Sequence, residues 1–124
     1  MAQFSWEPLD FLEALEVVPT EEEYGISYRY LLAKAPISLD LTIWPLTGDV
    51  ALLLACVGLA EPLVHLNLLE SPGARVVRDK QGTFIEFAAA KLFEGRYDYR
   101  DTPPYGFRLQ VQPFIQVRTF SYPQ

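Results

Sequence analysis

Strict alternation of apolar and polar side chains is the feature that most constrains the fold of this chain. In the segment ISLDLTIW, residues 37–44, every odd position is aliphatic and the even positions are Ser, Asp, Thr and Trp. The same two-residue period recurs in LVHLNLL at 63–69 and in GFRLQVQPFIQVRTF at 106–120. Successive side chains of a β-strand point to opposite faces, so this pattern is typical of strands with one buried face. The chain is therefore predicted to be mainly β.

Turn signals divide residues 26–122 into about eight predicted strands. The segments LTGD and ESPG mark turns, and KQG predicts a hairpin between its flanking strands. The stretch 107–119 keeps its alternation but is too long for one straight strand in a domain of this size. It is expected to bend near Pro113, where it can also pass to a second sheet. These features favour an antiparallel β-sandwich or a flattened barrel.

The segment VALLLACV, residues 50–57, is apolar on both sides and permits two interpretations. Its short length between turn signals favours a central strand of the sheet. The alternative is an α+β fold in which residues 49–60 form a buried helix packed on one face of a sheet.

One short amphipathic helix is predicted near the N-terminus, at residues 6–17. Ser5 is placed as its N-cap and Pro8 in its first turn, where the missing N–H costs nothing. Such a helix is expected to cover a sheet, and the alternative is that it docks on a partner. Its apolar face is assigned to residues at a spacing of three, namely Trp6, Leu9, Leu12 and Leu15.

The length of 124 residues fits a single domain, 1–124, with no compositional boundary inside it. Half of the residues are apolar, so a core is available, and the single cysteine, Cys56, excludes an intramolecular disulfide. The longest apolar run, residues 50–60, is shorter than the about 20 residues that cross a bilayer. The N-terminal segment has no basic residue, so no signal peptide is expected. We expect a cytoplasmic protein without a membrane anchor.

The net charge of −6 is distributed unevenly along the chain. Residues 1–62 hold two basic and ten acidic groups, whereas residues 63–124 hold eight basic and six acidic groups. Nucleic acids and anionic membranes bind concentrated basic surfaces, which this acidic chain lacks, so neither is an expected partner. A basic protein is the partner that this charge favours, because complementary charges accelerate association. The plainer interpretation is that the charge keeps the protein in solution.

The sequence contains no recognisable catalytic set. Its only histidine, His65, lies on the polar side of a predicted strand, and Cys56 lies within an apolar run where a thiol is unreactive. One His and one Cys do not make a zinc site. Calcium on the loop that holds Glu94, Asp98 and Asp101 is disfavoured by interleaved arginines. No enzyme activity, metal or cofactor is expected.

The segment FEGRYDYRDTPPYG, residues 93–106, is the candidate for recognition. Tyrosine and arginine dominate binding hot spots, because both combine a large apolar surface with a polar end, and the double proline stiffens the exit of the segment. The alternative interpretation is a packed connection between two strands. The predicted contact residues are Arg96, Tyr97, Tyr99, Arg100 and Tyr105, with Arg108 and Gln110 on the adjoining strand.

Two classes of function follow from these features. The first is a non-enzymatic protein-interaction module, such as an adaptor, an inhibitor or the antidote of a basic toxin. The second is a β-sandwich that binds a small ligand, for instance a carbohydrate, with tyrosine rings stacked on sugar. A cleft lined by the tyrosines favours the second class, and an exposed flat patch favours the first. A homodimer formed through a glutamine-rich edge strand is a further prediction.

Overall fold

A computed structural model of the chain describes residues 4–89 and 105–122. Within these residues one α-helix and one short 3-10 helix accompany nine strands. The prediction of a mainly β fold with one short N-terminal helix is confirmed. The elements are α1 (Pro8–Leu15), β1 (Thr20–Glu21), η1 (Glu23–Gly25), β2 (Tyr28–Lys34), β3 (Ile37–Trp44), β4 (Asp49–Cys56), β5 (Val64–Leu68), β6 (Ala74–Asp79), β7 (Gly82–Ala88), β8 (Tyr105–Gln110) and β9 (Gln116–Ser121).

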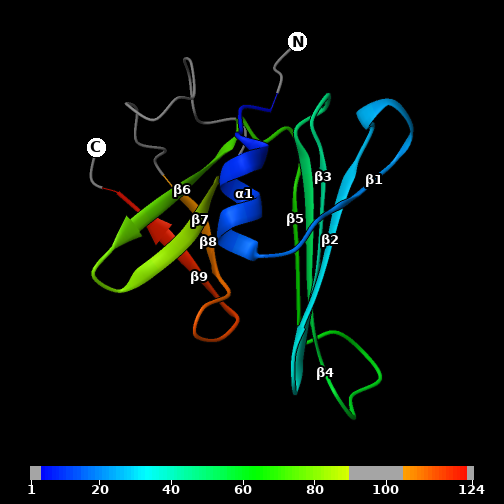
Figure 1. Cartoon of the computed structure of the whole chain (residues 1–124), viewed down its shortest axis with the longest axis vertical. Coiled ribbons are helices and arrows are strands. Elements are labelled where there is room, and N and C mark those ends of the chain that lie inside the picture. Colours follow the sequence, from blue (N-terminus) through cyan, green and yellow to red (C-terminus); the bar gives the residue numbers. More distant parts are fainter. Residues whose placement is uncertain (1–3, 90–104, 123–124) are drawn as a thin grey trace.

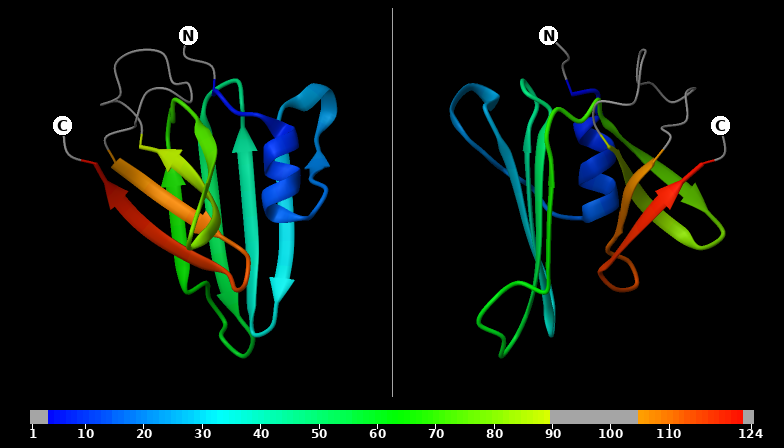
Figure 2. Two further views of the ribbon diagram at one scale, coloured as in Figure 1. Left: turned by 60° about the vertical axis from the view of Figure 1, so that its left-hand side comes forward. Right: turned by 180° about the vertical axis from the view of Figure 1, so that it is seen from behind.

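The strands form two antiparallel sheets in which each strand pairs with the next one along the chain (Figure 1). The first sheet has the order β1-β2-β3-β4-β5 and the second has the order β6-β7-β8-β9. The sheets meet at the end where the chain passes from β5 to β6, and α1 lies between them (Figures 1 and 2). Neither sheet closes on itself, so of the two predicted architectures the sandwich is the one observed.

The core lies between the sheets and is built from the alternating side chains. On β3 and β4 alternate aliphatic residues are buried, whereas the positions between them are only partly buried or exposed. Each fully buried aliphatic or aromatic side chain contributes roughly 1.5–3 kcal/mol of transfer free energy. The buried residues of the two sheets include Tyr30, Leu39, Leu41, Ile43, Val50 and Leu52 on one side and Ile85, Phe87, Phe107 and Leu109 on the other.

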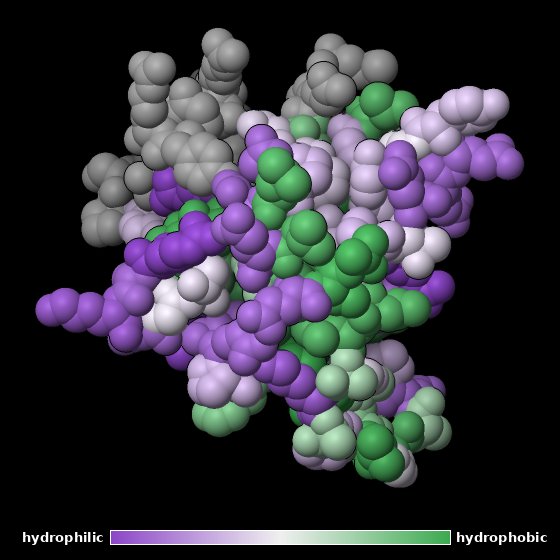
Figure 3. All heavy atoms as spheres, viewed as in Figure 1, coloured by the Kyte–Doolittle hydropathy of each residue, from purple (hydrophilic) through white to green (hydrophobic). Residues whose placement is uncertain are grey.

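Helix α1 is shorter than predicted, and its buried face differs from the predicted one. Glu7 is the N-cap, and its Oε1 accepts a hydrogen bond from the Leu9 amide, so the assignment of Ser5 as the cap is wrong. The buried positions are Phe11, Ala14 and Leu15. A strict spacing of three drifts around an α-helix, which has 3.6 residues per turn, and this drift leaves Leu9 67% exposed. Figure 3 shows hydrophobic side chains at the surface over α1.

Residues 49–56 form strand β4 at the interior of the first sheet, so the alternative of a buried helix at 49–60 is wrong. Strand β4 pairs with β3 on one side and with β5 on the other. A central strand with both neighbours present buries aliphatic side chains on one face and partly buries those on the other, and this explains the continuous apolar run.

The stretch 107–119 is a hairpin rather than one bent strand. Strand β8 ends at Gln110, residues 111–115 turn the chain, and β9 returns beside β8 with Arg108 directly opposite Arg118. The predicted bend near Pro113 is therefore confirmed, but the passage to a second sheet is wrong. The alternation persists through the turn because both strands of the hairpin present one face to the same core.

A buried junction at Ser71 connects the two sheets. The Ser71 amide donates to the Gly48 carbonyl (2.8 Å) in the β3–β4 turn, and the Ser71 hydroxyl donates to the Ala88 carbonyl (2.6 Å) at the end of β7. Ser5 forms a parallel bridge with Gly73 beside them. Ser71 is only 1% exposed. The turn of one sheet, the connection between the sheets and the end of β7 are thus held together by hydrogen bonds.

We expect the substitution Gly48→Ala to destabilise the protein more than Gly58→Ala does. Both glycines have positive φ, +82° and +91°, which costs a non-glycine residue about 1–2 kcal/mol. A Cβ at Gly48 would also lie 2.5 Å from the Ser71 carbonyl oxygen, whereas a Cβ at Gly58 meets nothing within 4 Å. Urea denaturation should give an additional loss of about 1–3 kcal/mol for Gly48→Ala. Equal losses for the two variants would contradict the close contact at Ser71.

Burial raises the pKa of Tyr30, a core residue that is 1% exposed, well above the usual value for tyrosine. Above about pH 10 the unfolded chain releases the Tyr30 proton and the folded chain retains it, so stability falls as the pH rises. We expect Tyr30→Phe to reduce this loss between about pH 8 and pH 11, measured as the change in urea midpoint. The control Tyr24→Phe, at a 99% exposed position, should lose stability as the wild type does.

Candidate interaction surfaces

The predicted recognition segment lies mostly outside the described residues. Arg96, Tyr97, Tyr99 and Arg100 all fall within 90–104, so their roles stay predictions. The residues that flank this segment are adjacent in space, because the Ala89 amide donates to the Tyr105 carbonyl (2.9 Å). Tyr105 begins β8 and is 39% exposed. The described residues on either side of 90–104 therefore lie together, beside the end of β7.

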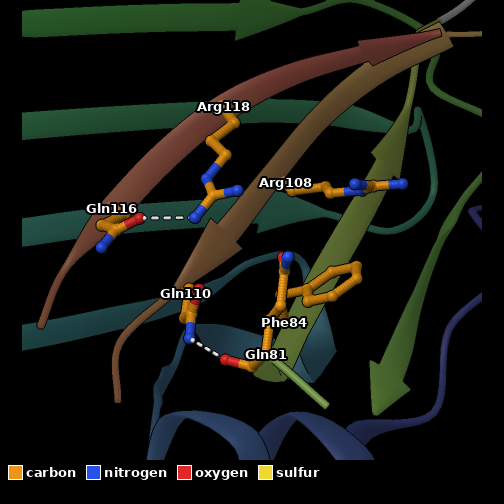
Figure 4. Close-up of a pocket in the computed structure, with 6 residues that line it drawn as sticks. All are labelled: Gln81, Phe84, Arg108, Gln110, Gln116 and Arg118. Carbon is orange, nitrogen blue, oxygen red and sulfur yellow. Dashed lines mark hydrogen bonds between the residues drawn. The ribbon is translucent and has the colours of Figure 1, made fainter. Parts of the chain in front are cut away.

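Arg108 and Gln110, the other two predicted contact residues, lie on the outer face of the four-stranded sheet (Figure 4). The register places four charged side chains in one row across this sheet, one from each strand: Arg75, Glu86, Arg108 and Arg118. We call this surface the arginine face. Gln110 is only 9% exposed, and its amide donates to the Gln112 carbonyl (2.7 Å) and the Gln81 carbonyl (3.3 Å). The side-chain amide of Gln110 is therefore engaged in hydrogen bonds with the backbone next to the sheet.

Glu86 is a buried carboxylate that organises the arginine face. Its Oε1 lies 2.9 Å from Nε of Arg75 and its Oε2 lies 2.9 Å from Nε of Arg108. The Tyr122 hydroxyl donates a further short hydrogen bond to Oε2. The Glu86 side chain has no exposed surface. Burial of an ion is costly unless it is paired and hydrogen-bonded, and these partners meet that requirement.

Arg108 is held on both sides by Glu86 and by aromatic rings. Its guanidinium lies 4.8 Å from the ring centre of Phe84, 5.0 Å from that of Phe120 and 5.5 Å from that of Tyr122. Burial lowers the pKa of Arg108, but hydrogen bonds with Tyr122 and Glu86 outweigh this effect and raise the pKa overall. The side chain is therefore a fixed cation embedded in an aromatic surface.

The exposed cation of the arginine face is Arg118 on the edge strand β9. Its Nη2 donates to Oε1 of Gln116 (3.0 Å), and the two side chains border a small hollow with Gln81 and Gln110 (Figure 4). The hollow has a volume of about 10 Å³, roughly that of one water molecule. A sugar ring does not fit in this hollow.

Sequence reasoning did not single out Glu86, although a signal for it exists. In TFIEFAAA the period of two places Glu86 on the same face as Phe84 and Ala88. A carboxylate on an apolar strand face requires a countercharge, and arginines occur on both neighbouring strands. Identifying which arginine lies opposite requires the strand register, which the sequence does not specify.

Cys56 and His65, the only cysteine and histidine of the sequence, could act as nucleophile and base only if they were in contact, and the structure separates them. His65 is exposed on the outer face of the first sheet, and Cys56 shares the opposite, core-facing side with Leu54. Cys56 is partly buried, as a residue at the end of a strand can be. Within residues 4–89 and 105–122 no three His, Cys, Asp or Glu side chains gather as a metal site. The loop carboxylates Glu94, Asp98 and Asp101 lie outside these residues.

The outer face of the five-stranded sheet is a second surface, which the sequence pattern assigned simply to solvent. It is hollowed in two adjoining places that share Asp40 and Leu53, with volumes of about 420 Å³ and about 280 Å³. We call this surface the cradle. The alternation correctly predicts which side chains point outward, but it does not indicate that neighbouring loops rise around them.

The helix described here is too short to cross a membrane. No protein-family model matches the sequence, and no curated protein matches it. The fold is similar to that of a chain in a solved contact-dependent growth inhibition toxin–immunity protein complex from Klebsiella pneumoniae 342. The TM-score is 0.74, and the match covers 98% of both chains at 14% sequence identity. At this identity the similarity is one of fold.

We expect Glu86→Gln to destabilise the protein by about 2–4 kcal/mol, because it leaves two arginines facing a neutral, buried amide. The matched control is Glu13→Gln, which removes an exposed pair with Arg78 (3.1 Å). Exposed pairs contribute under about 1 kcal/mol, so the control should be close to wild type in urea denaturation. A Glu86→Gln variant as stable as the control would show that the buried carboxylate does not hold this face together.

Proposed function

We propose that this chain is a non-enzymatic protein-interaction module of the toxin-antidote type. The observation that carries the proposal is the similarity of fold, over nearly the full length of both chains, to a chain of a toxin–immunity protein complex. The identity is too low to transfer a partner or a contact residue from that complex. The partner that we propose is a protein, and the proposed location is the cytoplasm, in agreement with the single cysteine.

The surface chemistry of the described residues supports protein contact. The arginine face presents Arg108 already fixed by Glu86 and aromatic rings, so little conformational entropy is lost when it binds. Arginine and tyrosine side chains of this kind are typical of interface hot spots. The proposed contact set combines Tyr105 and Arg108 with the predicted loop residues Arg96, Tyr97, Tyr99 and Arg100.

The proposal predicts that tagged wild-type protein retains one defined protein from a lysate of the organism that encodes it. We expect the double variant Tyr97→Ala/Arg100→Ala to bind the purified partner at least about tenfold more weakly, since two hot-spot side chains are removed. The measurement is the Kd by calorimetry, after circular dichroism has shown that the variant is folded.

The control variant Phe114→Ala/Arg78→Ala removes an exposed aromatic residue and an exposed arginine from other parts of the surface. It should bind as the wild type does. A partner retained equally by both double variants would support the class of function and exclude the loop as its contact. Retention of no protein, or only of a second copy of this chain through the edge strand β9, would overturn the antidote proposal.

A further inference from the structure

The cradle is an open sheet face with exposed apolar side chains in its floor. The register aligns Leu31, Asp40, Leu53 and His65 in one row across β2, β3, β4 and β5. Leu31 is 51% exposed although it lies in the middle of a strand. Small side chains form the neighbouring row of the sheet, so the floor is recessed beside the two leucines. These small residues are Ala33, Ser38 and Ala55.

Two loops form the walls of the cradle at opposite ends of the sheet. Pro62 of the β4–β5 loop lines one hollow, and Glu22 and Ser27, which flank η1, line the other. Figure 2 shows both loops projecting to the same side of the sheet, away from α1. Each loop carries exposed apolar side chains. These are Tyr24 and Ile26 at one end and Val57, Leu59 and Leu63 at the other.

The charge of the cradle is negative around a neutral floor. Asp40 in the floor is paired with Arg29 through two hydrogen bonds, of 2.6 Å and 3.0 Å. Glu22 lines the hollow at η1 with Glu23 beside it, and Glu61 precedes Pro62 in the β4–β5 loop; all three carboxylates belong to exposed residues. Among the described residues on this face, Arg29 is the only lysine or arginine, and Asp40 already neutralises it.

We propose that the cradle binds a basic segment of a partner protein, which inserts an apolar side chain beside Leu31 and Leu53 and places arginine or lysine against the wall glutamates. This inference rests on the proposed function in that the partner is a protein, but it does not depend on the predicted loop. An apolar centre with a charged rim is the arrangement of a specific protein interface, in which the rim steers the encounter.

A second copy of this chain is a less suitable occupant than a basic partner. Two cradles facing each other would bring their wall glutamates together, and like charges across an interface oppose association. The arginine face of another copy is complementary in charge, but repeated contact between two different faces of one protein produces open chains rather than a closed dimer.

The test uses the protein that tagged wild type retains from the lysate, purified as the partner. Its binding to two cradle variants is measured and compared with its binding to wild type. Leu53→Lys places a cation in the floor and is expected to weaken binding at least about tenfold, mainly through faster dissociation. Glu22→Lys/Glu61→Lys replaces one carboxylate of each wall by a cation and is expected to weaken binding about tenfold and to reduce its dependence on salt between about 50 and 500 mM.

The matched control is Glu13→Lys/Glu16→Lys, which makes the same change of net charge on exposed residues of α1 and at its C-terminus. It should bind within about threefold of wild type, because the general charge effect is small compared with a lost contact. Circular dichroism and urea denaturation confirm the fold of each variant.

Each outcome separates this inference from the proposed function. A basic partner lost with both cradle variants and retained by the control supports the inference. A partner that binds the cradle variants as well as wild type, or that is acidic, overturns the inference and leaves the proposed function standing. Wild-type protein that forms concentration-dependent oligomers abolished by Leu53→Lys identifies a second copy as the occupant and also overturns it. If wild type binds no protein, both proposals fail.

Discussion

The buried Ser71 junction determines how the two sheets of this protein are placed. Its hydroxyl and amide join the β3–β4 turn to the end of β7 through the carbonyls of Gly48 and Ala88. Because these groups are excluded from water, leaving any of them unpaired would cost about 1–3 kcal/mol. The two sheets are thus fixed relative to each other at one end, and α1 fills the space between them with Phe11 and Leu15.

The two sheets carry charges of opposite sign, and the order of the strands explains this. Every strand pairs with its neighbour in sequence, so the acidic first half of the chain builds α1 and most of the first sheet. Arg75, Arg108 and Arg118 of the second half face outward from the second sheet. An asymmetry that runs along the sequence therefore becomes an asymmetry between two faces of the folded protein. Such a charge distribution orients an approaching charged partner before contact.

Sequence periodicity identified the strands because a period of two has one physical cause, the alternation of side chains about an extended backbone. It failed where local pattern and tertiary contact differ. The spacing of Trp6, Leu9, Leu12 and Leu15 suggested one helix face, but packing between the sheets selected Phe11, Ala14 and Leu15. The length of the alternating stretch 107–119 predicts a bend near Pro113, but only the pairing of β8 with β9 shows that the chain returns within the same sheet.

The sequence by itself determined the mainly β fold, the inward-facing residues of β3, and the hairpin at KQG, because these depend on neighbours within a few residues. Only the tertiary structure decided that Glu86 pairs with Arg75 and Arg108, which lie 11 and 22 residues away along the chain. It also decided that two loops rise around Leu31 and Leu53 to make the cradle. Both features depend on strand register and loop direction, which arise from contacts between distant segments.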